Sequence, residues 1–95
     1  MFVVIAKQKI QSEKIQLFKD SVAVMAPKTR MYPGCVSYEL LQSKYDESVF
    51  IFHELWDNEA DFEAHFEADF TKKFEDVLQD ISDGPVEPYI CEIVV

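Results

Sequence analysis

Two adjacent strand-forming segments, residues 35–43 and 48–56, constrain the fold of this chain more than any other feature of its sequence. The four residues between them are a hairpin-length connection, so we expect the two segments to pair antiparallel. The second segment has large apolar side chains of both parities: Phe50, Phe52 and Trp56 on one face, and Val49, Ile51 and Leu55 on the other. A sheet with one face in water alternates apolar with polar residues instead. Both faces of this hairpin therefore need a cover.

The segments before and after the hairpin add further strands and helices. Residues 1–10 are rich in β-branched side chains and predict a strand, and residues 86–95 predict a last one. From residue 12 to 26, apolar side chains recur at helical spacing, which predicts an amphipathic helix. This helix ends near Pro27 or continues to Pro33-Gly34, a pair that cannot be helical.

Four phenylalanines at intervals of four mark a second helical region that begins after Asn58 and extends to about Ile81: Phe62, Phe66, Phe70 and Phe74. On a helix with 3.6 residues per turn, each step of four drifts by about 40°. A break near Ala68-Asp69, with Asp69 as a second cap, would keep every phenylalanine inward. We therefore expect two short helices in this region.

The resulting order, β-α-β-β-α-β, is the split βαβ pattern of ferredoxin-like α+β domains. It predicts a single domain over residues 1–95, with a four-stranded antiparallel sheet and helices on one face. The other face would be bare, and its simplest cover is the same sheet of a second copy. We therefore expect a homodimer in which two chains form a dimeric α/β barrel.

Charge and composition narrow the classes of partner. The chain has 18 acidic and 9 basic residues, a formal net charge of −9, which repels phosphate backbones and anionic lipids. We therefore expect no nucleic-acid partner and no membrane partner. The apolar run at residues 2–6 is too short for a signal sequence or a membrane span, which favours a cytoplasmic protein. Cys35 and Cys91 have no metal-ligand spacing and are interpreted as free thiols.

Charge is also distributed unevenly along the chain. Residues 57–83 contain ten acidic side chains and only two basic ones, Lys72 and Lys73. The simplest interpretation is a solvated acidic face, and a basic partner is the alternative.

Four stretches of the sequence resemble the antibiotic biosynthesis monooxygenase (ABM) family of small dimeric ferredoxin-like proteins. They are FVVIAKQKI, PGCVSYELLQS, FIFHELWDNEADFEAHFEADFTKKF and the closing strand, and together they span nearly the whole chain. The most specific is the strand end Glu54-Leu55-Trp56 followed by a helix that carries Glu63-Ala64-His65, since the family commonly shows E-x-W and then E-A-H. The family includes quinol monooxygenases, polyketide oxygenases, haem-degrading monooxygenases and the isomerase of phosphorylated autoinducer-2.

The haem-degrading branch fits the residues poorly. Its members share an Asn on the first strand, and a Trp and a haem-ligating His ten residues apart on the second helical region. Here the first strand has Ala6 and Lys7, and the helical positions fall near His65 and Phe74, so the ligand is missing. The resemblance to the other oxygenases implies an enzyme without metal or organic cofactor. Neither a Gly-rich phosphate loop nor a metal-ligand spacing is present in the sequence.

A quinol or polyphenol must lose a proton before it gives an electron to O2. Such an enzyme needs a dry aromatic pocket, a base that titrates near neutral pH and a donor for the resulting anion. His65 is the leading base, because imidazole titrates in this range and the residue lies among phenylalanines. Glu54 shares a strand face with Phe52 and Trp56, where a carboxylate is costly to bury unless it is paired or protonated. Trp56 would wall the pocket or donate its indole N–H.

The remaining candidates would contact substrate: Tyr38 as a donor to a quinol oxygen, and Phe52, Phe62, Phe66, Phe70 and Phe74 as aromatic walls. Each candidate also has a structural alternative. The aromatic residues would be core, and His65 would be a helix-surface residue hydrogen-bonded to Asp61 or Asp69.

The function expected first is a dimeric monooxygenase that oxidises quinol-like or polyphenolic molecules with O2 and needs no cofactor. In this hypothesis His65 is the base or the stabiliser of the anion. Two alternatives stay open. One is an isomerase of a small dicarbonyl or phosphorylated ketose metabolite, of the autoinducer-2-processing type, and the other is a dimer that binds a small molecule without turnover.

Overall fold

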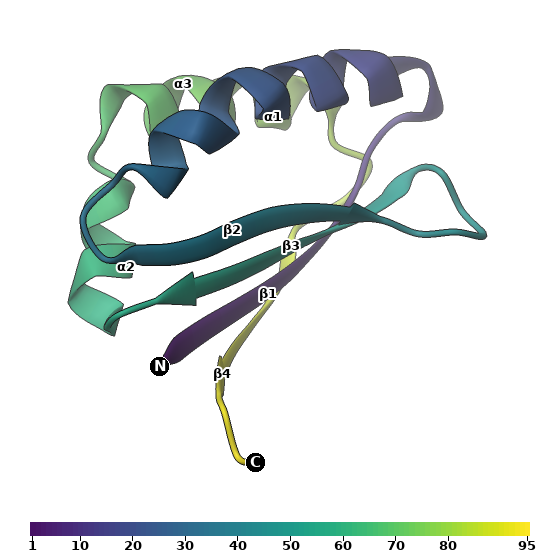
Figure 1. Ribbon diagram of the computed structural model, residues 1–95. Coiled ribbons are helices and arrows are strands. Elements are labelled where there is room, and N and C mark those ends of the chain that lie inside the picture. Colours follow the sequence, from purple (N-terminus) through teal and green to yellow (C-terminus); the bar gives the residue numbers. More distant parts are fainter.

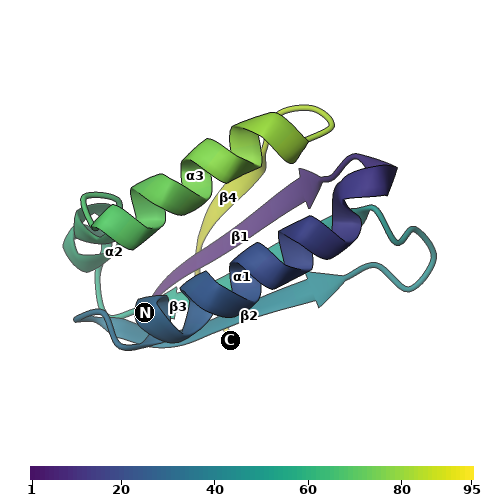
Figure 2. The same cartoon turned by 90° about the horizontal axis from the view of Figure 1, so that it is seen from above.

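The computed structural model describes residues 1–95, and its strands and helices follow the predicted order (Figure 1). The elements are β1 (Phe2–Lys9), the 3-10 turn η1 (Ser12–Lys14), α1 (Ile15–Arg30), β2 (Cys35–Gln42), β3 (Val49–Trp56), α2 (Glu59–His65), α3 (Asp69–Ile81) and β4 (Glu87–Glu92). The four strands form one antiparallel sheet in the order β2-β3-β1-β4. α1 and α3 lie side by side over one face of this sheet (Figure 2). This is the ferredoxin-like arrangement that the sequence predicts.

The second helical region breaks where the spacing of its phenylalanines predicts a break. α2 ends at His65 and α3 begins at Asp69. Asn58 caps α2, because its side-chain oxygen accepts a hydrogen bond of 2.9 Å from the backbone N–H of Asp61.

Two details of this region differ from the prediction. Ala68 is the N-cap of α3, and no side chain caps that helix, so Asp69 is not a second cap. Phe66 is 38% exposed, because it lies in the turn just after α2 rather than on the buried stripe of a helix.

Of the two ends predicted for the first helix, the one near Pro27 is wrong. α1 includes this proline and continues to Arg30.

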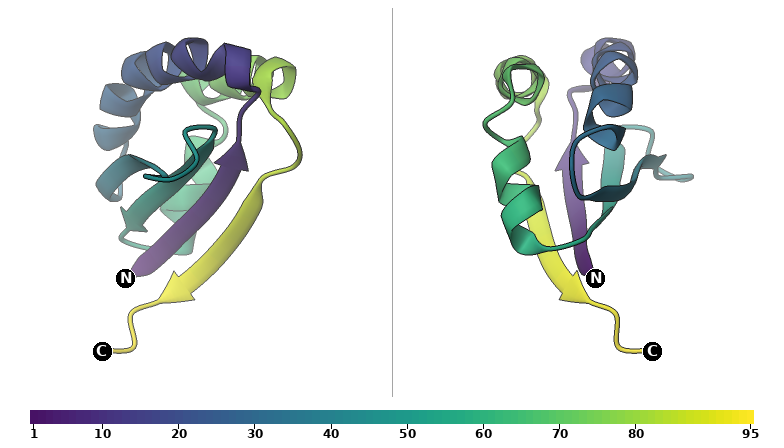
Figure 3. Two further views of the ribbon diagram at one scale, coloured as in Figure 1. Left: turned by 90° about the vertical axis from the view of Figure 1, so that its right-hand side faces the viewer. Right: turned by 60° about the vertical axis from the view of Figure 1, so that its left-hand side comes forward.

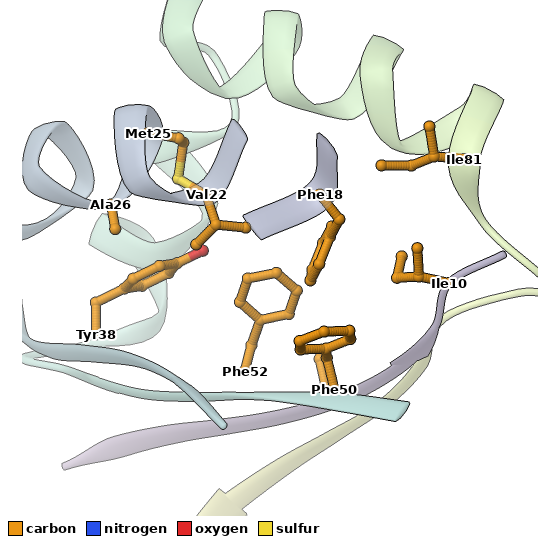
Figure 4. Close-up of a cluster of buried hydrophobic side chains, with 10 residues drawn as sticks. Ile10, Phe18, Val22, Met25, Ala26, Tyr38, Phe50, Phe52 and Ile81 are labelled. Carbon is orange, nitrogen blue, oxygen red and sulfur yellow. The ribbon is translucent and has the colours of Figure 1, made fainter. Parts of the chain in front are cut away.

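The core fills the space between the helices and the sheet (Figure 4). The residues of β3 at even positions point toward the helices and are buried, as the alternation of the strand requires. Phe18 of α1 contacts Phe50 of β3, with ring centroids 4.7 Å apart, and Phe52, at 6.1 Å. The core therefore combines the aromatic rings of Phe18, Tyr38, Phe50 and Phe52 with aliphatic side chains, such as Val22 and Met25 of α1.

No helix covers the opposite face of the sheet (Figures 1 and 3). Apolar side chains lie on this face. Tyr89 of β4 is 61% exposed and Leu41 of β2 is 47% exposed, while Ile5, Ile51 and Leu55 are half-buried. The strand pairing places these residues on one face, because Ile5 pairs with Tyr89 and Ile51 pairs with Leu41. No helix of the chain is long and apolar enough to cross a lipid bilayer.

Gly34 makes the turn between α1 and β2 and brings α2 close to it. Its φ angle is +86°, in the left-handed region that favours glycine. The side chain of Asp61 occupies the space that a Cβ at this position would take. The Gly34 carbonyl also accepts a hydrogen bond of 2.8 Å from the backbone N–H of Asp57. Gly34 therefore fixes the end of β3 and the start of α2 against the start of β2.

We predict that Gly34→Ala destabilises the fold by about 2–4 kcal/mol, measured by urea denaturation. A left-handed alanine costs roughly 1–2 kcal/mol, and the collision with Asp61 adds to it. Gly84→Ala is the matched control, since Gly84 has a φ of +102° but no neighbour where its Cβ would lie. Equal losses of stability in the two variants would contradict the proposed packing of α2 against this turn.

Candidate functional site

The three residues expected to be catalytic meet at the end of β3. Glu54 and Trp56 point toward the helix side of the sheet, and His65 is the last residue of α2; all three are buried. The Trp56 indole Nε1–H donates a hydrogen bond of 3.0 Å to Oε1 of Glu54. The Trp56 and His65 rings lie 4.7 Å apart between centroids, tilted by 32°. Trp56 therefore links the carboxyl group and the imidazole.

The imidazole of His65 is held in one tautomer. Its Nδ1 is hydrogen-bonded to the backbone carbonyl of Phe62, which can only accept, so Nδ1 carries the proton. Burial lowers the pKa of His65, and the Phe62 carbonyl opposes this shift. The ring is therefore neutral near pH 7 and has an unprotonated Nε2. The surface alternative, a hydrogen bond to Asp61 or Asp69, is wrong because the ring is buried and bonded to Phe62.

Glu54 has an unusually high proton affinity for a carboxyl group. Burial raises its pKa to about 7, and the hydrogen bond from Trp56 lowers it only in part. Tyr38 of β2 pairs with Glu54 in the sheet register. Burial, and then the charge of Glu54, raise the pKa of Tyr38 well above its usual range, so this phenol keeps its proton. The site therefore combines an acid that titrates near neutrality with a permanent hydrogen-bond donor.

Three polar atoms of this cluster have no hydrogen-bond partner in the protein, yet they are not fully buried. They are Oε2 of Glu54, Oη of Tyr38 and Nε2 of His65; the carboxyl and imidazole bonds described above use other atoms of these groups. Thr71 Oγ1 is the only fully buried side-chain oxygen or nitrogen in the chain that lacks a partner. It follows that the three atoms keep some contact with solvent, although their side chains are buried.

The four phenylalanines of the second helical region divide into two groups. Phe62 and Phe66 surround His65, with ring centroids 5.3 and 4.2 Å from the imidazole. Phe74 instead contacts Phe52 of the core, at 6.2 Å. The break between α2 and α3 therefore turns Phe62 and Phe66 toward His65 and Phe74 toward the core, and contact of these rings with a substrate stays a prediction.

Two cavities lie away from the catalytic candidates. One, of about 230 Å³, lies between α1 and α3 and is lined by residues that include Phe70 and Phe74. Another lies beside Gln8 and Ser82 at the far end of α3. Neither is lined by Glu54, Trp56 or His65.

Sequence reasoning missed Tyr32 at this site, and it considered Arg30 only as a cation for a phosphorylated substrate. Tyr32 lies between the two phenylalanine groups, with its ring 6.4 Å from His65 and 6.3 Å from Phe70, and its hydroxyl donates to the carbonyl of Ala64. Its place before Pro33 identified it only as a helix end. Arg30 donates from Nε to the backbone carbonyl of Tyr38 at 3.0 Å. No group of three His, Cys, Asp or Glu side chains is placed to hold a metal ion.

The sheet order and the one-sided helices define the class of protein, a ferredoxin-like α+β domain with a buried Glu-Trp-His cluster at one end. The family model described as antibiotic biosynthesis monooxygenase matches residues 1–81. The chain therefore belongs to the antibiotic biosynthesis monooxygenase family.

Solved structures agree with this fold. A protein of Nitrosomonas europaea, provisionally assigned as an antibiotic biosynthesis monooxygenase, is 23% identical, covers 100% of both chains and has a TM-score of 0.95. A conserved protein of Methanosarcina mazei Go1 is 24% identical over 95% of this chain and 89% of its own, with a TM-score of 0.90. A Bacteroides thetaiotaomicron protein of unknown function, described as a possible oxidoreductase, is 14% identical over 95% and 96%, with a TM-score of 0.84. At these identities the likeness is one of fold. No curated protein matches the chain.

Proposed function

We propose that this chain is a cofactor-independent monooxygenase that oxidises quinol-like or polyphenolic small molecules with O2. The observation that carries the proposal is the Glu54 carboxyl group, which is buried, has a pKa of about 7 and keeps Oε2 free of any protein partner. A base of this strength is half ionised at neutral pH, which is where a general base is most effective. Membership of a monooxygenase family supports the choice of reaction.

The reaction needs no additional reductant. A quinol plus O2 gives a hydroxyquinone plus water, so the substrate supplies all the electrons. One oxygen atom enters a new C–O bond, and the other leaves as water. Ionised Glu54 takes the proton of one phenolic hydroxyl, and the more electron-rich anion then transfers an electron to O2. The protein's task is to hold and deprotonate the ring in an environment that excludes bulk water.

The neighbours of Glu54 have distinct roles in this proposal. Tyr38 donates a hydrogen bond to the substrate anion, because its own pKa is too high for it to act as a base. His65, with Nε2 unprotonated, accepts a hydrogen bond from a second hydroxyl. Its lowered pKa makes it a weaker base than an ordinary histidine, so we assign deprotonation to Glu54. Trp56 orients Glu54 and, with Phe62, supplies aromatic surface beside the ring.

We also propose that the chain works as a homodimer whose subunits meet through the uncovered face of the sheet. The apolar side chains there come from all four strands, including Ile5, Leu41, Ile51 and Tyr89. Large exposed apolar patches are rare on monomers, and a sheet can pack against its own copy about a two-fold axis.

We predict that light scattering after gel filtration gives twice the chain mass for the native protein at micromolar concentration. Ile51→Glu, which places a charge at the centre of the uncovered face, gives the mass of one chain. Tyr45→Glu is the control. Tyr45 is exposed in the hairpin loop, so we expect this variant to keep the mass of the native protein. A native protein that elutes as a monomer, or an Ile51→Glu variant that folds and stays dimeric, would contradict this interface.

We predict that the native protein consumes O2 with menadiol faster than the uncatalysed reaction. Its kcat/KM rises with pH and levels off above about pH 7, since Glu54 must be ionised to act. Glu54→Gln keeps the acceptor for Trp56 but removes the base. This variant lowers kcat by about 100-fold or more and abolishes the rise near pH 7. Oxygen-electrode rates and the incorporation of one labelled oxygen atom from ¹⁸O2 provide the measurements.

Glu63→Gln is the matched control, because Glu63 is on the exposed side of α2 and its loss leaves the rate unchanged. Two outcomes would reject the oxygenase. Hydrogen exchange into a dicarbonyl substrate without O2 uptake would indicate the isomerase, and a ligand-induced rise in Tm without turnover would indicate a binding protein.

A further inference from the structure

A cavity that the proposed function leaves unused lies between α1 and α3, and we call it the α1–α3 groove. Its volume is about 230 Å³. It is lined by four residues of each helix: Ser21, Val24, Met25 and Lys28 of α1, and Phe70, Lys73, Phe74 and Val77 of α3. No residue of the sheet lines it, so it is distinct from the cluster around Glu54.

The groove follows directly from the sequences of the two helices. On both helices the lining residues are spaced i, i+3, i+4 and i+7, which places them on one face of each helix. Met25 is buried, and Phe70 and Phe74 are half-buried, so the groove is apolar inside. Val24 is 65% exposed and leaves apolar surface open to solvent beside the cavity.

Two lysines flank this apolar space, and neither has an acidic partner. Lys72 pairs with Glu67 at 3.3 Å, whereas Lys28 and Lys73 form no ion pair. This is unexpected for Lys73, since residues 57–83 contain ten acidic side chains. An apolar space with two unpaired ammonium groups is complementary to a ligand with an apolar body and one negative charge.

We propose that the α1–α3 groove is a second small-molecule site, which binds monocyclic aromatic carboxylates. Pockets for drug-sized ligands have volumes of about 300–1,000 Å³, so this smaller groove fits one ring rather than a fused polycycle. The ring packs on Phe70 and Phe74, and the carboxylate lies between Lys28 and Lys73. The net charge of −9 opposes anion capture at long range, so the affinity is modest. Added salt weakens binding because it screens the attraction between the carboxylate and the two exposed lysines.

Aromatic rings lie between the α1–α3 groove and the cluster around Glu54. Phe70 contacts Tyr32, which contacts His65, and Phe74 contacts Phe52 of the core. A ligand that packs on Phe70 in the groove is therefore separated from His65 by the ring of Tyr32. Binding in the groove does not depend on the proposed oxygenase reaction.

Two-dimensional ¹H–¹⁵N NMR with benzoate tests the proposal, with benzyl alcohol as a neutral probe of the same ring. We expect benzoate to shift the amides of Val24 and Lys73 before those of Glu54 or His65. The double variant Lys28→Gln/Lys73→Gln should raise the Kd for benzoate roughly five- to tenfold and leave that for benzyl alcohol unchanged.

Lys14→Gln/Lys44→Gln is the matched control, because it removes the same charge at exposed positions outside the groove. It should leave benzoate binding within twofold of native. Val24→Trp, a substitution at an exposed position, should fill the groove and weaken both probes. Equal benzoate affinity in the native protein and the Lys28→Gln/Lys73→Gln variant would overturn the proposal. So would shifts confined to Glu54 and His65, or no saturable binding. Each of these outcomes leaves O2 uptake with menadiol unaffected, so the proposed function is tested separately.

Discussion

The hydrogen bond from Trp56 to Glu54 is the contact on which the proposed chemistry depends. It holds a carboxyl group on the buried face of a central strand, where its ionised form is poorly solvated. A shift of the pKa from 4.5 to about 7 corresponds to about 3 kcal/mol against ionisation. The folded chain binds this proton more tightly than the unfolded chain. The contribution of Glu54 to stability is therefore complete below its unfolded pKa and is lost as pH rises through about 7. The fold thus gives up stability at neutral pH to keep a base of suitable strength.

The rest of the architecture positions this carboxyl group. β1 and β2 flank β3, so Glu54 lies on an inner strand of the sheet, near the end of that strand, with Tyr38 beside it. The turn at Gly34 brings α2 against the end of β3, and α2 ends at His65, which packs on Trp56. The break after α2 then lets α3 cover the core and leaves a groove against α1. One sheet therefore supports the buried cluster, while its uncovered face is free for a second copy of the chain.

The sequence predicted the sheet and the helices because each has a clear period. Alternation in residues 48–56 placed Glu54 and Trp56 on one face, and the drift of a four-residue repeat required the break before α3. The same reasoning could not divide the phenylalanines, because the direction of a chain after a break depends on tertiary contacts. Tyr32 was missed for a related reason: its neighbours come from α2 and α3, far along the chain. The direction of the pKa shift at Glu54 followed from its apolar face, but its size depends on burial that only the folded chain defines.

The central claim is that Glu54 titrates near neutral pH in the folded protein. ¹³C NMR of the side-chain carboxyl carbon of Glu54, followed from pH 4 to pH 9 and assigned by comparison with Glu54→Gln, measures this property without a substrate. The account predicts a single inflection at about pH 7. An inflection near 4.5, the ordinary value for glutamate, would show that the carboxylate is well solvated and would remove the base from the proposed reaction.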